Sequence, residues 1–468
     1  MIEILLSLAT LGVLSSGFLL LLKKLGLFSP SIALLFGIAL CIHLGATLFI
    51  HYAEFYPFGG GQGDQFLYHG AATTIAVDFQ QGVFSTERIV QALAAHRMQH
   101  WYPVLLGILY AITIPAVIMG KILSVWFACV AIILLFLVTR ELGISDKGAF
   151  AVGLMGSIYP SFLYFGSLLL RESAIVAIVL LTTLLLLKLV QEFSWKKFLF
   201  LYATFLLLVH LRFYIGLVII FATAFCLFFC QQASWDKRLK NVLPAIFLLG
   251  FIPQLFGYGY YGIQTFVTFL HPEKIQTYRE TAYVVRDTPQ AQPKAEESKK
   301  EQPVEQPKIE KPVEVQPKIP QLKGGELGRG GGGGSTVVVE VDTKNPLTFL
   351  GQNLVSLSHV ILGPFPWHIK YDRQFFVLGE TIPWLVLFFL AVLGAFSTFR
   401  KTWRLSLPLM LIAFCLLGMI GLFMDNFGVY MRIRIPAFLL LLALVPLGFP
   451  FVERWMKRVS PARVKNSQ

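Results

Sequence analysis

The sequence predicts an all-α polytopic membrane protein with about eleven transmembrane helices. Hydrophobic residues make up 56% of the 468 residues and charged residues only 14%, and the mean hydropathy is +0.68. Soluble domains are about a quarter charged. Several uncharged apolar runs also reach the roughly 20 residues that a helix needs to cross the hydrocarbon core of a bilayer. These runs are continuous rather than alternating, which excludes a transmembrane β-barrel.

The apolar runs and the charge distribution together predict the spans and their orientation. The spans lie at residues 4–22, 31–50, 121–139, 148–168, 173–190, 197–211, 213–230, 241–257, 380–398, 406–424 and 435–452. The short basic segments after alternate spans, with the tail, carry the whole net charge of +13, and loops rich in Lys and Arg face the cytoplasm. We therefore expect the amino terminus outside, the carboxyl terminus inside, and no nucleic-acid partner.

Two long segments, residues 51–120 and 258–379, interrupt the helical pattern on the predicted outer side. Residues 102–118 contain Pro103 and Pro115, and counting them as a span would invert every later loop, so we predict a re-entrant or interfacial helix there. Residues 287–334 are rich in Pro, Lys, Glu and Gly, which predicts a disordered linker. The amphipathic stretch before Pro364 predicts a second interfacial helix.

These features divide the chain into consecutive parts. They are an N-terminal transmembrane hairpin (1–50), a first outer loop with the re-entrant helix (51–120), a transmembrane core (121–257), the start of the second outer loop (258–286), the linker (287–334), an outer segment with the interfacial helix (335–379), C-terminal transmembrane helices (380–452) and a basic cytoplasmic tail (453–468).

Charged residues beside a membrane are energetically expensive, so their positions indicate candidate sites. Asp64 follows the glycine-rich run 59–63 and precedes Tyr68 by four residues, which places both on one face of a helix that begins near Asp64. A helix N-cap is the simpler interpretation of this aspartate. Arg171 and Glu172 are predicted on the same side of the membrane, where a structural salt bridge is the alternative.

Further basic residues are predicted on this outer side. They are Lys121, Arg212, Arg432 and Arg434. Each can extend to the lipid headgroups, but their convergence around two carboxylates would suit an anionic headgroup. His96 and His100 are four residues apart, a spacing that occurs in metal sites, but no third ligand accompanies them and we predict no metal site.

The order of the motifs resembles the GT-C superfamily of integral-membrane glycosyltransferases, which includes protein O-mannosyltransferases, aminoarabinose transferases and bacterial lipopolysaccharide and polysaccharide transferases. The motifs are GDQFLYHGAA (63–72), HWYPVLLGILYAI (100–112), KILSVWFACVAIILLFLVTRELG (121–143), GLMGSIYPSFLYFGSLLLRES (153–173) and YMRIRIPAFLLLLAL (430–444). An additional span before the first outer loop and the Pro-rich insertion depart from the pattern of the family.

This resemblance implies an inverting sugar transfer from a polyprenyl-phosphate-linked donor to a glycan, lipid or protein acceptor, at the outer face of a bacterial plasma (inner) membrane. It implies Asp64 as the catalytic base and Glu172 as a catalytic residue that orients the substrate or binds a divalent cation, Mg²⁺ or Mn²⁺. The implied residues for binding substrate and phosphate are Tyr68, His100, Arg171, Arg212, Arg432 and Arg434.

Two other functions fit the same sequence. An oligosaccharide repeat-unit polymerase or ligase of surface polysaccharide synthesis also has many spans and a large outer loop with arginines. A non-enzymatic membrane scaffold would use the Pro-rich segment 287–323 to bind a partner. In the scaffold, Asp64 and Glu172 would be dispensable, whereas deletion of the Pro-rich segment would abolish function.

Overall fold

The computed structural model describes residues 2–56, 62–98, 100–255, 271, 345–365, 375–423 and 427–459. Every regular element within these ranges is a helix, which confirms the all-α prediction for the described part of the chain. The predicted linker at 287–334 lies outside the described residues, as does most of the predicted basic tail.

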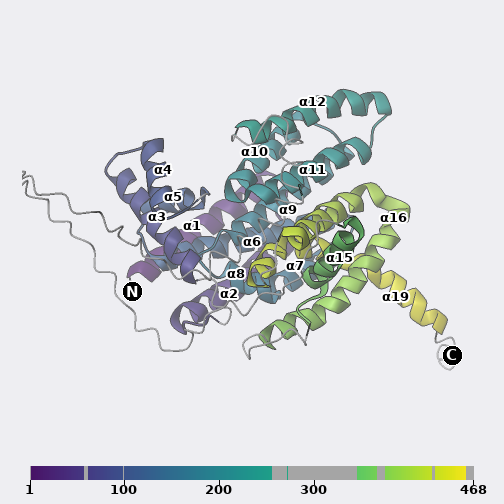
Figure 1. The fold of residues 1–468 in the computed structure, drawn as a ribbon. Helices are drawn as coiled ribbons and strands as arrows, with labels where there is room; N and C mark the ends of the chain where they lie inside the picture. The colour runs from purple at the N-terminus through teal and green to yellow at the C-terminus, as the bar shows by residue number, and fades with distance from the viewer. Residues whose placement is uncertain are drawn as a thin grey trace, which may run out of the picture.

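Figure 1 shows the helices in their spatial arrangement. In chain order they are α1 (Ile2–Lys24), α2 (Pro30–Tyr52), α3 (Gln62–Gln80), α4 (Thr86–Ala95), α5 (Tyr102–Ile112), α6 (Val117–Glu141), α7 (Asp146–Ile158), α8 (Pro160–Gly166), α9 (Glu172–Gln191), α10 (Trp195–Leu211), α11 (Phe213–Phe229), α12 (Trp235–Leu255), α15 (Pro346–Leu362), α16 (Phe375–Phe423), α17 (Phe427–Ile433), α18 (Ile435–Leu442) and α19 (Val445–Val459).

The structure describes a multi-pass membrane protein. Among the described residues, six helices are long and apolar enough to cross a bilayer: α1, α2, α6, α9 and the two parts of α16, Leu378–Thr398 and Thr402–Phe423. The bent pairs α7 with α8 and α18 with α19 raise this number to eight if each pair forms one span. Backbone angles at Thr402 are not helical, which separates the two parts of α16.

Three further predicted spans coincide with α10, α11 and α12 but do not meet these criteria. Helices α10 and α11 have 17 residues each, fewer than the roughly 20 that match the bilayer core. Helix α12 begins with the charged run from Asp236 to Lys240. The number of about eleven spans therefore stays a prediction.

Helices α6 and α9 form the centre of the bundle. Within their apolar windows 89% and 78% of the residues are buried, whereas the share for α1 is 17%. Helix α6 packs against α1, α2, α7 and α9. Figure 1 shows α3, α4 and α5 on one side of this pair, α10 to α12 on a second side, and α15, α16 and α19 on a third. The uniformly apolar sequences of α6 and α9 agree with burial on all sides.

The helix predicted at residues 102–118 coincides with the shorter α5, and its re-entrant or interfacial place on the outer side stays a prediction. Pro103 lies in its first turn, where a missing N–H leaves no bond unmade, and the helix ends at Ile112, before Pro115. Its 11 residues extend about 16 Å at ~1.5 Å per residue, too short for a core of ~30 Å. The second predicted interfacial helix coincides with α15, which Asn345 caps, and its position at the membrane interface stays a prediction.

Helix α16 crosses the junction of α18 and α19 at two glycines. A Cβ at Gly394 would collide with the carbonyl oxygen of Leu444, and a Cβ at Gly448 with that of Leu390. Small residues allow such close approach of helix backbones in membranes. At this crossing the first part of α16 packs directly against the junction of α18 and α19.

We expect Gly394→Ala to lower the free energy of unfolding by about 1–3 kcal/mol, because the added methyl group overpacks the crossing. The matched control is Gly418→Ala in the second part of α16, where a Cβ meets nothing within 4 Å and the better helix propensity of alanine raises the free energy of unfolding by up to about 1 kcal/mol. Unfolding curves in detergent measure both variants. Equal stability of the two would contradict the close crossing.

Candidate functional site

Five charged side chains from separate parts of the chain meet in what we call the charged cluster: Asp64, Arg171, Glu172, Arg212 and Arg432. Asp64 lies in the first turn of α3, Arg171 and Glu172 at the start of α9, Arg212 between α10 and α11, and Arg432 near the end of α17. The structure thus brings together both residues predicted to be catalytic and three of the arginines predicted to bind phosphate.

Ion pairs connect the members of the charged cluster. Arg432 lies between the two carboxylates: its Nη1 donates a hydrogen bond to Asp64 Oδ2 at 2.8 Å, and its Nε is 3.6 Å from Glu172 Oε1. Arg212 Nη2 donates to the same Glu172 oxygen at 3.0 Å. Asp64 and Glu172, which are distant in sequence, therefore share one cation. Asp64 is not the N-cap, because α3 already begins at Gln62.

The charged cluster extends from the accessible surface into the protein. The side chain of Asp64 is 36% exposed and that of Arg432 is 16% exposed, whereas Glu172 and Arg212 are each 3% exposed. Charges interact more strongly where water is excluded. Glu172 and Arg212 therefore form the fixed inner end of the cluster, and Asp64 is the carboxylate that a second molecule can reach.

A buried glutamine fixes the position of Asp64 relative to α9. Gln65 Oε1 accepts a hydrogen bond from the backbone N–H of Leu169 at 3.2 Å, and Ser124 Oγ donates to the carbonyl oxygen of Leu170 at 3.2 Å. The two hydrogen bonds fix the turn before α9 to α3, through Gln65, and to α6, through Ser124. Gln65 was not among the candidate residues predicted from the sequence, although a polar side chain directly after Asp64 in a largely apolar helix was the available signal.

Arg171 and Arg212 are held together by a break between two helices. The backbone of Arg212 is extended (φ −157°, ψ 92°), so α10 ends at Leu211 and α11 begins at Phe213. Arg171 Nη1 donates to the carbonyl oxygen of Leu211 at 2.7 Å. This bond satisfies one of the carbonyl groups that a helix end leaves open and places a positive charge where the helix dipole favours it.

Two uncharged aromatic side chains lie beside the charged cluster. The buried ring of Tyr68 packs edge to face on His100, with the ring centres 4.9 Å apart. Burial raises the pKa of Tyr68 to about 12. Burial, together with the charges of Arg171 and Arg212, lowers the pKa of His100 to about 2. At neutral pH both side chains are uncharged and can offer hydrogen bonds to a polar ligand.

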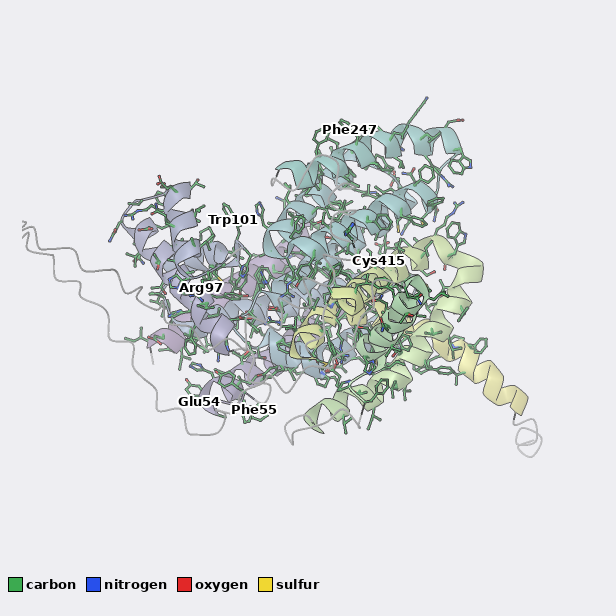
Figure 2. All side chains as sticks on the ribbon, viewed as in Figure 1. Glu54, Phe55, Arg97, Trp101, Phe247 and Cys415 are labelled. Carbon is green, nitrogen blue, oxygen red and sulfur yellow. The ribbon has the colours of Figure 1, made fainter. Side chains whose placement is uncertain are left out.

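The segment that carries His100 is anchored to the end of α10. The backbone N–H of Trp101 donates to the carbonyl oxygen of His210 at 3.3 Å, and the two rings are 5.2 Å apart. Figure 2 labels Trp101 where the group of α3 to α5 meets α10. Because Arg212 follows α10 directly, this contact fixes His100 relative to the arginines.

The charged cluster has an excess of positive charge. Burial lowers the pKa of Arg432, but Glu172 and Asp64 outweigh this effect and raise it above its ordinary value. Burial and the neighbouring Arg212 lower the pKa of Arg171, although a guanidinium keeps its proton in proteins. Three guanidinium groups thus face two carboxylates, which leaves one positive charge in excess. Such a site attracts an anion.

Several buried polar atoms of the site have no hydrogen-bond partner among the described residues. They are Glu172 Oε2, His100 Nδ1 and the Nε atoms of Arg171, Arg212 and Arg432. Buried polar atoms are normally hydrogen-bonded, and each exception needs an explanation. The charged cluster therefore keeps donors and acceptors that no other described residue satisfies.

Arg434 does not join the charged cluster, which corrects the grouping expected from the sequence. Residues two apart on a helical backbone do not face each other, so Arg434 points away from Arg432. Its Nη2 donates to Glu380 Oε1 at 2.9 Å, and its Nη1 donates to the carbonyl oxygens of Val360 and Gly363. The Arg434 side chain is 1% exposed, so its donors are committed inside the protein.

Glu380 is the centre of this second, fully buried network, which the sequence analysis missed. Its carboxylate accepts hydrogen bonds from the Tyr159 hydroxyl, from the backbone N–H of Ser161 at 2.8 Å and from the Ser161 hydroxyl, in addition to Arg434. The network joins α16 and α18 to the break between α7 and α8. An ionisable residue at the start of an apolar run was the available signal.

Two further basic residues singled out from the sequence, Lys121 and His96, also lie apart from the charged cluster. Lys121 Nζ is 3.5 Å from His51 Nδ1 and 3.4 Å from the Tyr56 hydroxyl. The His96 ring lies against Gly70, whereas His100 packs on Tyr68. No group of three potential metal ligands occurs in the described part of the chain. Within the charged cluster, the three neighbouring guanidinium groups disfavour a divalent cation at Glu172.

The fold and the site define a class: a multi-pass helical membrane protein in which separate helices bring arginines and carboxylates to one partly buried cluster. The chain matches no protein-family model and no curated protein sequence. Its function is therefore inferred from the residues of the charged cluster and from their chemistry.

Proposed function

We propose that the protein is a membrane glycosyltransferase that moves a sugar from a polyprenyl-phosphate-linked donor to a glycan, lipid or protein acceptor. One observation carries the proposal: Arg432 bridges Asp64 and Glu172 beside two further arginines. This combination supplies cations for a phosphate and a carboxylate for an acceptor hydroxyl. The proposal includes a GT-C-like arrangement of about eleven spans, with the charged cluster at the outer face of a bacterial plasma membrane.

The arginines suit a lipid-linked sugar phosphate. The phosphodiester of such a donor carries one negative charge, which equals the excess positive charge of the charged cluster. When the bond from the anomeric carbon to the phosphate oxygen breaks, the leaving phosphate gains a second charge. Guanidinium groups that are already fixed around the phosphate stabilise this developing charge. Arg171, Arg212 and Arg432 take this role, and the committed donors of Arg434 exclude it.

The carboxylates have different roles because their exposure differs. Asp64, the exposed member, takes the proton of the acceptor hydroxyl while that oxygen forms its bond to the anomeric carbon. Glu172 is buried and orients Arg212 and the donor. Both negative charges stabilise the oxocarbenium-like character of the transition state.

Arg432 couples donor binding to release of the base. Its side chain donates to Asp64 at 2.8 Å, so this carboxylate is engaged before the donor binds. A phosphate competes for the same guanidinium, and its binding draws Arg432 away from Asp64. The carboxylate then becomes available to accept the acceptor proton.

We expect Arg432→Ala to weaken donor binding by roughly 10- to 150-fold, because a hydrogen bond to a charged group contributes about 1.5–3 kcal/mol. The measurement is the equilibrium affinity of the purified protein for a polyprenyl-phosphate sugar in detergent. The matched control is Arg88→Ala, which removes an exposed arginine of α4 outside the charged cluster. Equal donor affinity in both variants would contradict the phosphate-binding role.

A further inference from the structure

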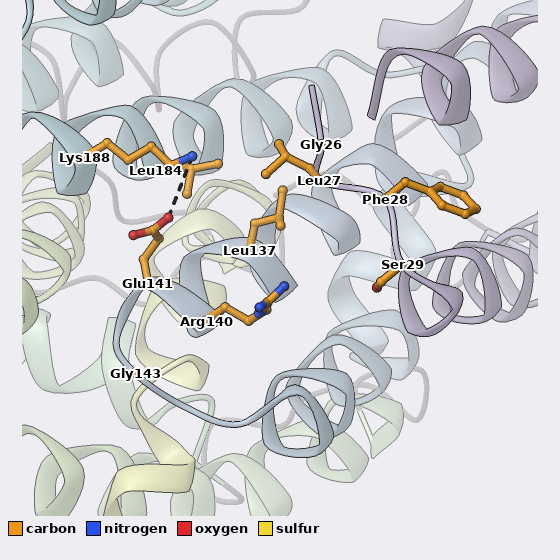
Figure 3. A pocket seen from close by; sticks show the side chains of 10 residues that line it. All are labelled: Gly26, Leu27, Phe28, Ser29, Leu137, Arg140, Glu141, Gly143, Leu184 and Lys188. Carbon is orange, nitrogen blue, oxygen red and sulfur yellow. Dashed lines mark ion pairs between the residues drawn. The ribbon is translucent and has the colours of Figure 1, made fainter. Parts of the chain in front are cut away.

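A pocket of about 400 Å³ opens where the turn between α1 and α2 meets the ends of α6 and α9. Its lining residues are Gly26, Leu27, Phe28, Ser29, Leu137, Arg140, Glu141, Gly143, Leu184 and Lys188. Figure 3 shows the Arg140 guanidinium on the side of Ser29, with Lys188 and Glu141 paired on the opposite side. The pocket contains no residue of the charged cluster.

The pocket and the charged cluster lie at opposite ends of the same helix. Glu172 begins α9 and Lys188 lies in its last turn. At ~1.5 Å per residue the two positions are about 24 Å apart along the helix axis, close to the thickness of a bilayer core. The pocket therefore lies at the membrane boundary that the charge distribution assigns to the cytoplasm.

The polar side of the pocket holds two cations, each paired with a carboxylate at the protein surface. Two cations, Arg140 and Lys188, and one carboxylate, Glu141, line it. Arg140 Nε is 2.9 Å from Asp146, and Lys188 Nζ is 3.7 Å from Glu141. Such partly exposed pairs contribute only about 0–1 kcal/mol. Both cations can therefore turn to a phosphate at little cost.

The other side of the pocket is apolar. Leu137 and Leu184 are buried in its wall, and Phe28 is 43% exposed beside it. A free inorganic anion would gain nothing from these side chains. A molecule with a phosphate at one end and hydrocarbon at the other would contact both sides at once.

We propose that this pocket binds the headgroup of an anionic phospholipid, with the phosphate between Arg140 and Lys188 and the first part of the acyl chains against Leu137 and Leu184. Basic pockets between helices at the cytoplasmic side of membrane proteins recognise anionic headgroups. The lining itself holds two cations and one carboxylate, since Asp146, the partner of Arg140, is not part of it, and two cations that can turn to one phosphate favour an anionic headgroup over a zwitterionic one. The proposal is independent of the function of the charged cluster.

The test is the thermal unfolding midpoint of the full chain in detergent, with added phosphatidylglycerol, phosphatidylcholine or inorganic phosphate. A ligand that binds only the folded state raises this midpoint. We expect phosphatidylglycerol alone to raise it, and we expect the double variant Arg140→Gln/Lys188→Gln to bind this lipid roughly tenfold more weakly or worse. The matched control Lys196→Gln/Lys197→Gln removes the same charge at the start of α10, outside the pocket lining.

Each alternative outcome overturns the proposal. An equal rise with phosphatidylcholine shows that headgroup charge is not recognised, and an equal rise with inorganic phosphate shows an anion site without lipid specificity. An unchanged lipid response in the double variant excludes this pocket. Native mass spectrometry of the wild-type protein with both lipids gives a readout without variants, and preferential retention of phosphatidylglycerol is the expected result.

Discussion

Asp64→Asn is expected to lower the rate of sugar transfer by about 10²–10⁴-fold, the usual contribution of general base catalysis. Asparagine keeps the shape of the side chain and can still accept a hydrogen bond from Arg432, but it cannot take the proton of the acceptor hydroxyl. Donor binding should therefore be retained or become tighter, because the donor phosphate no longer competes with a charged Asp64 for Arg432. The measurement is transfer from a polyprenyl-phosphate sugar by the purified protein in detergent or liposomes.

Two further variants make this result specific. Glu172→Gln should also lower the transfer rate, because it removes the charge that holds Arg212 and Arg432. Asp78→Asn is the matched control, since this aspartate lies at the other end of α3. Wild-type turnover of Asp64→Asn would reject Asp64 as the base. If Glu172→Gln were also fully active, the glycosyltransferase mechanism would give way to the scaffold that uses residues 287–323.

Glu380→Ala is expected to lower the free energy of unfolding by about 3–5 kcal/mol, the usual cost of removing one partner of a buried ion pair. The substitution leaves the guanidinium of Arg434 without its counter-charge at a position that is 1% exposed. It also leaves the donors of Tyr159 and Ser161 without their acceptor. Equilibrium unfolding in detergent measures the loss.

Matched variants separate the buried charge from general effects of substitution. Glu192→Ala removes an exposed partner of Lys197 and should change stability by less than about 1 kcal/mol. The double variant Glu380→Leu/Arg434→Met should be more stable than Glu380→Ala, because it removes both buried charges. Wild-type stability of Glu380→Ala would show that Arg434 does not depend on this pair and would reopen its assignment as a phosphate ligand.

The class of fold was predictable from the sequence because a bilayer imposes long apolar helices. The break before Pro115 was predictable for a similar reason, since proline restricts the preceding residue and ends helices. The number of spans was not predictable, because α10 and α11 have 17 residues each. Such helices either cross a membrane or pack against other helices, and apolar length alone does not distinguish these cases.

The convergence of Asp64, Glu172 and Arg432 was predictable only as far as all three were placed on one side of the membrane. Charge placement assigns residues to a side but not to a neighbour. The pairing of Arg434 with Glu380 depends on the packing of α16 against α18, which no local pattern encodes. Gln65 acts through a hydrogen bond to a turn distant in sequence, and the same limit applies to it.

The most direct test of the central claim is an experimental structure of the protein with a polyprenyl-phosphate sugar bound. We expect the phosphate within hydrogen-bond distance of Arg212 and Arg432, Arg432 withdrawn from Asp64, and the anomeric carbon facing the Asp64 carboxylate. A donor phosphate bound away from the charged cluster, for example beside Lys121, with the contact between Arg432 and Asp64 unchanged from 2.8 Å, would contradict the account.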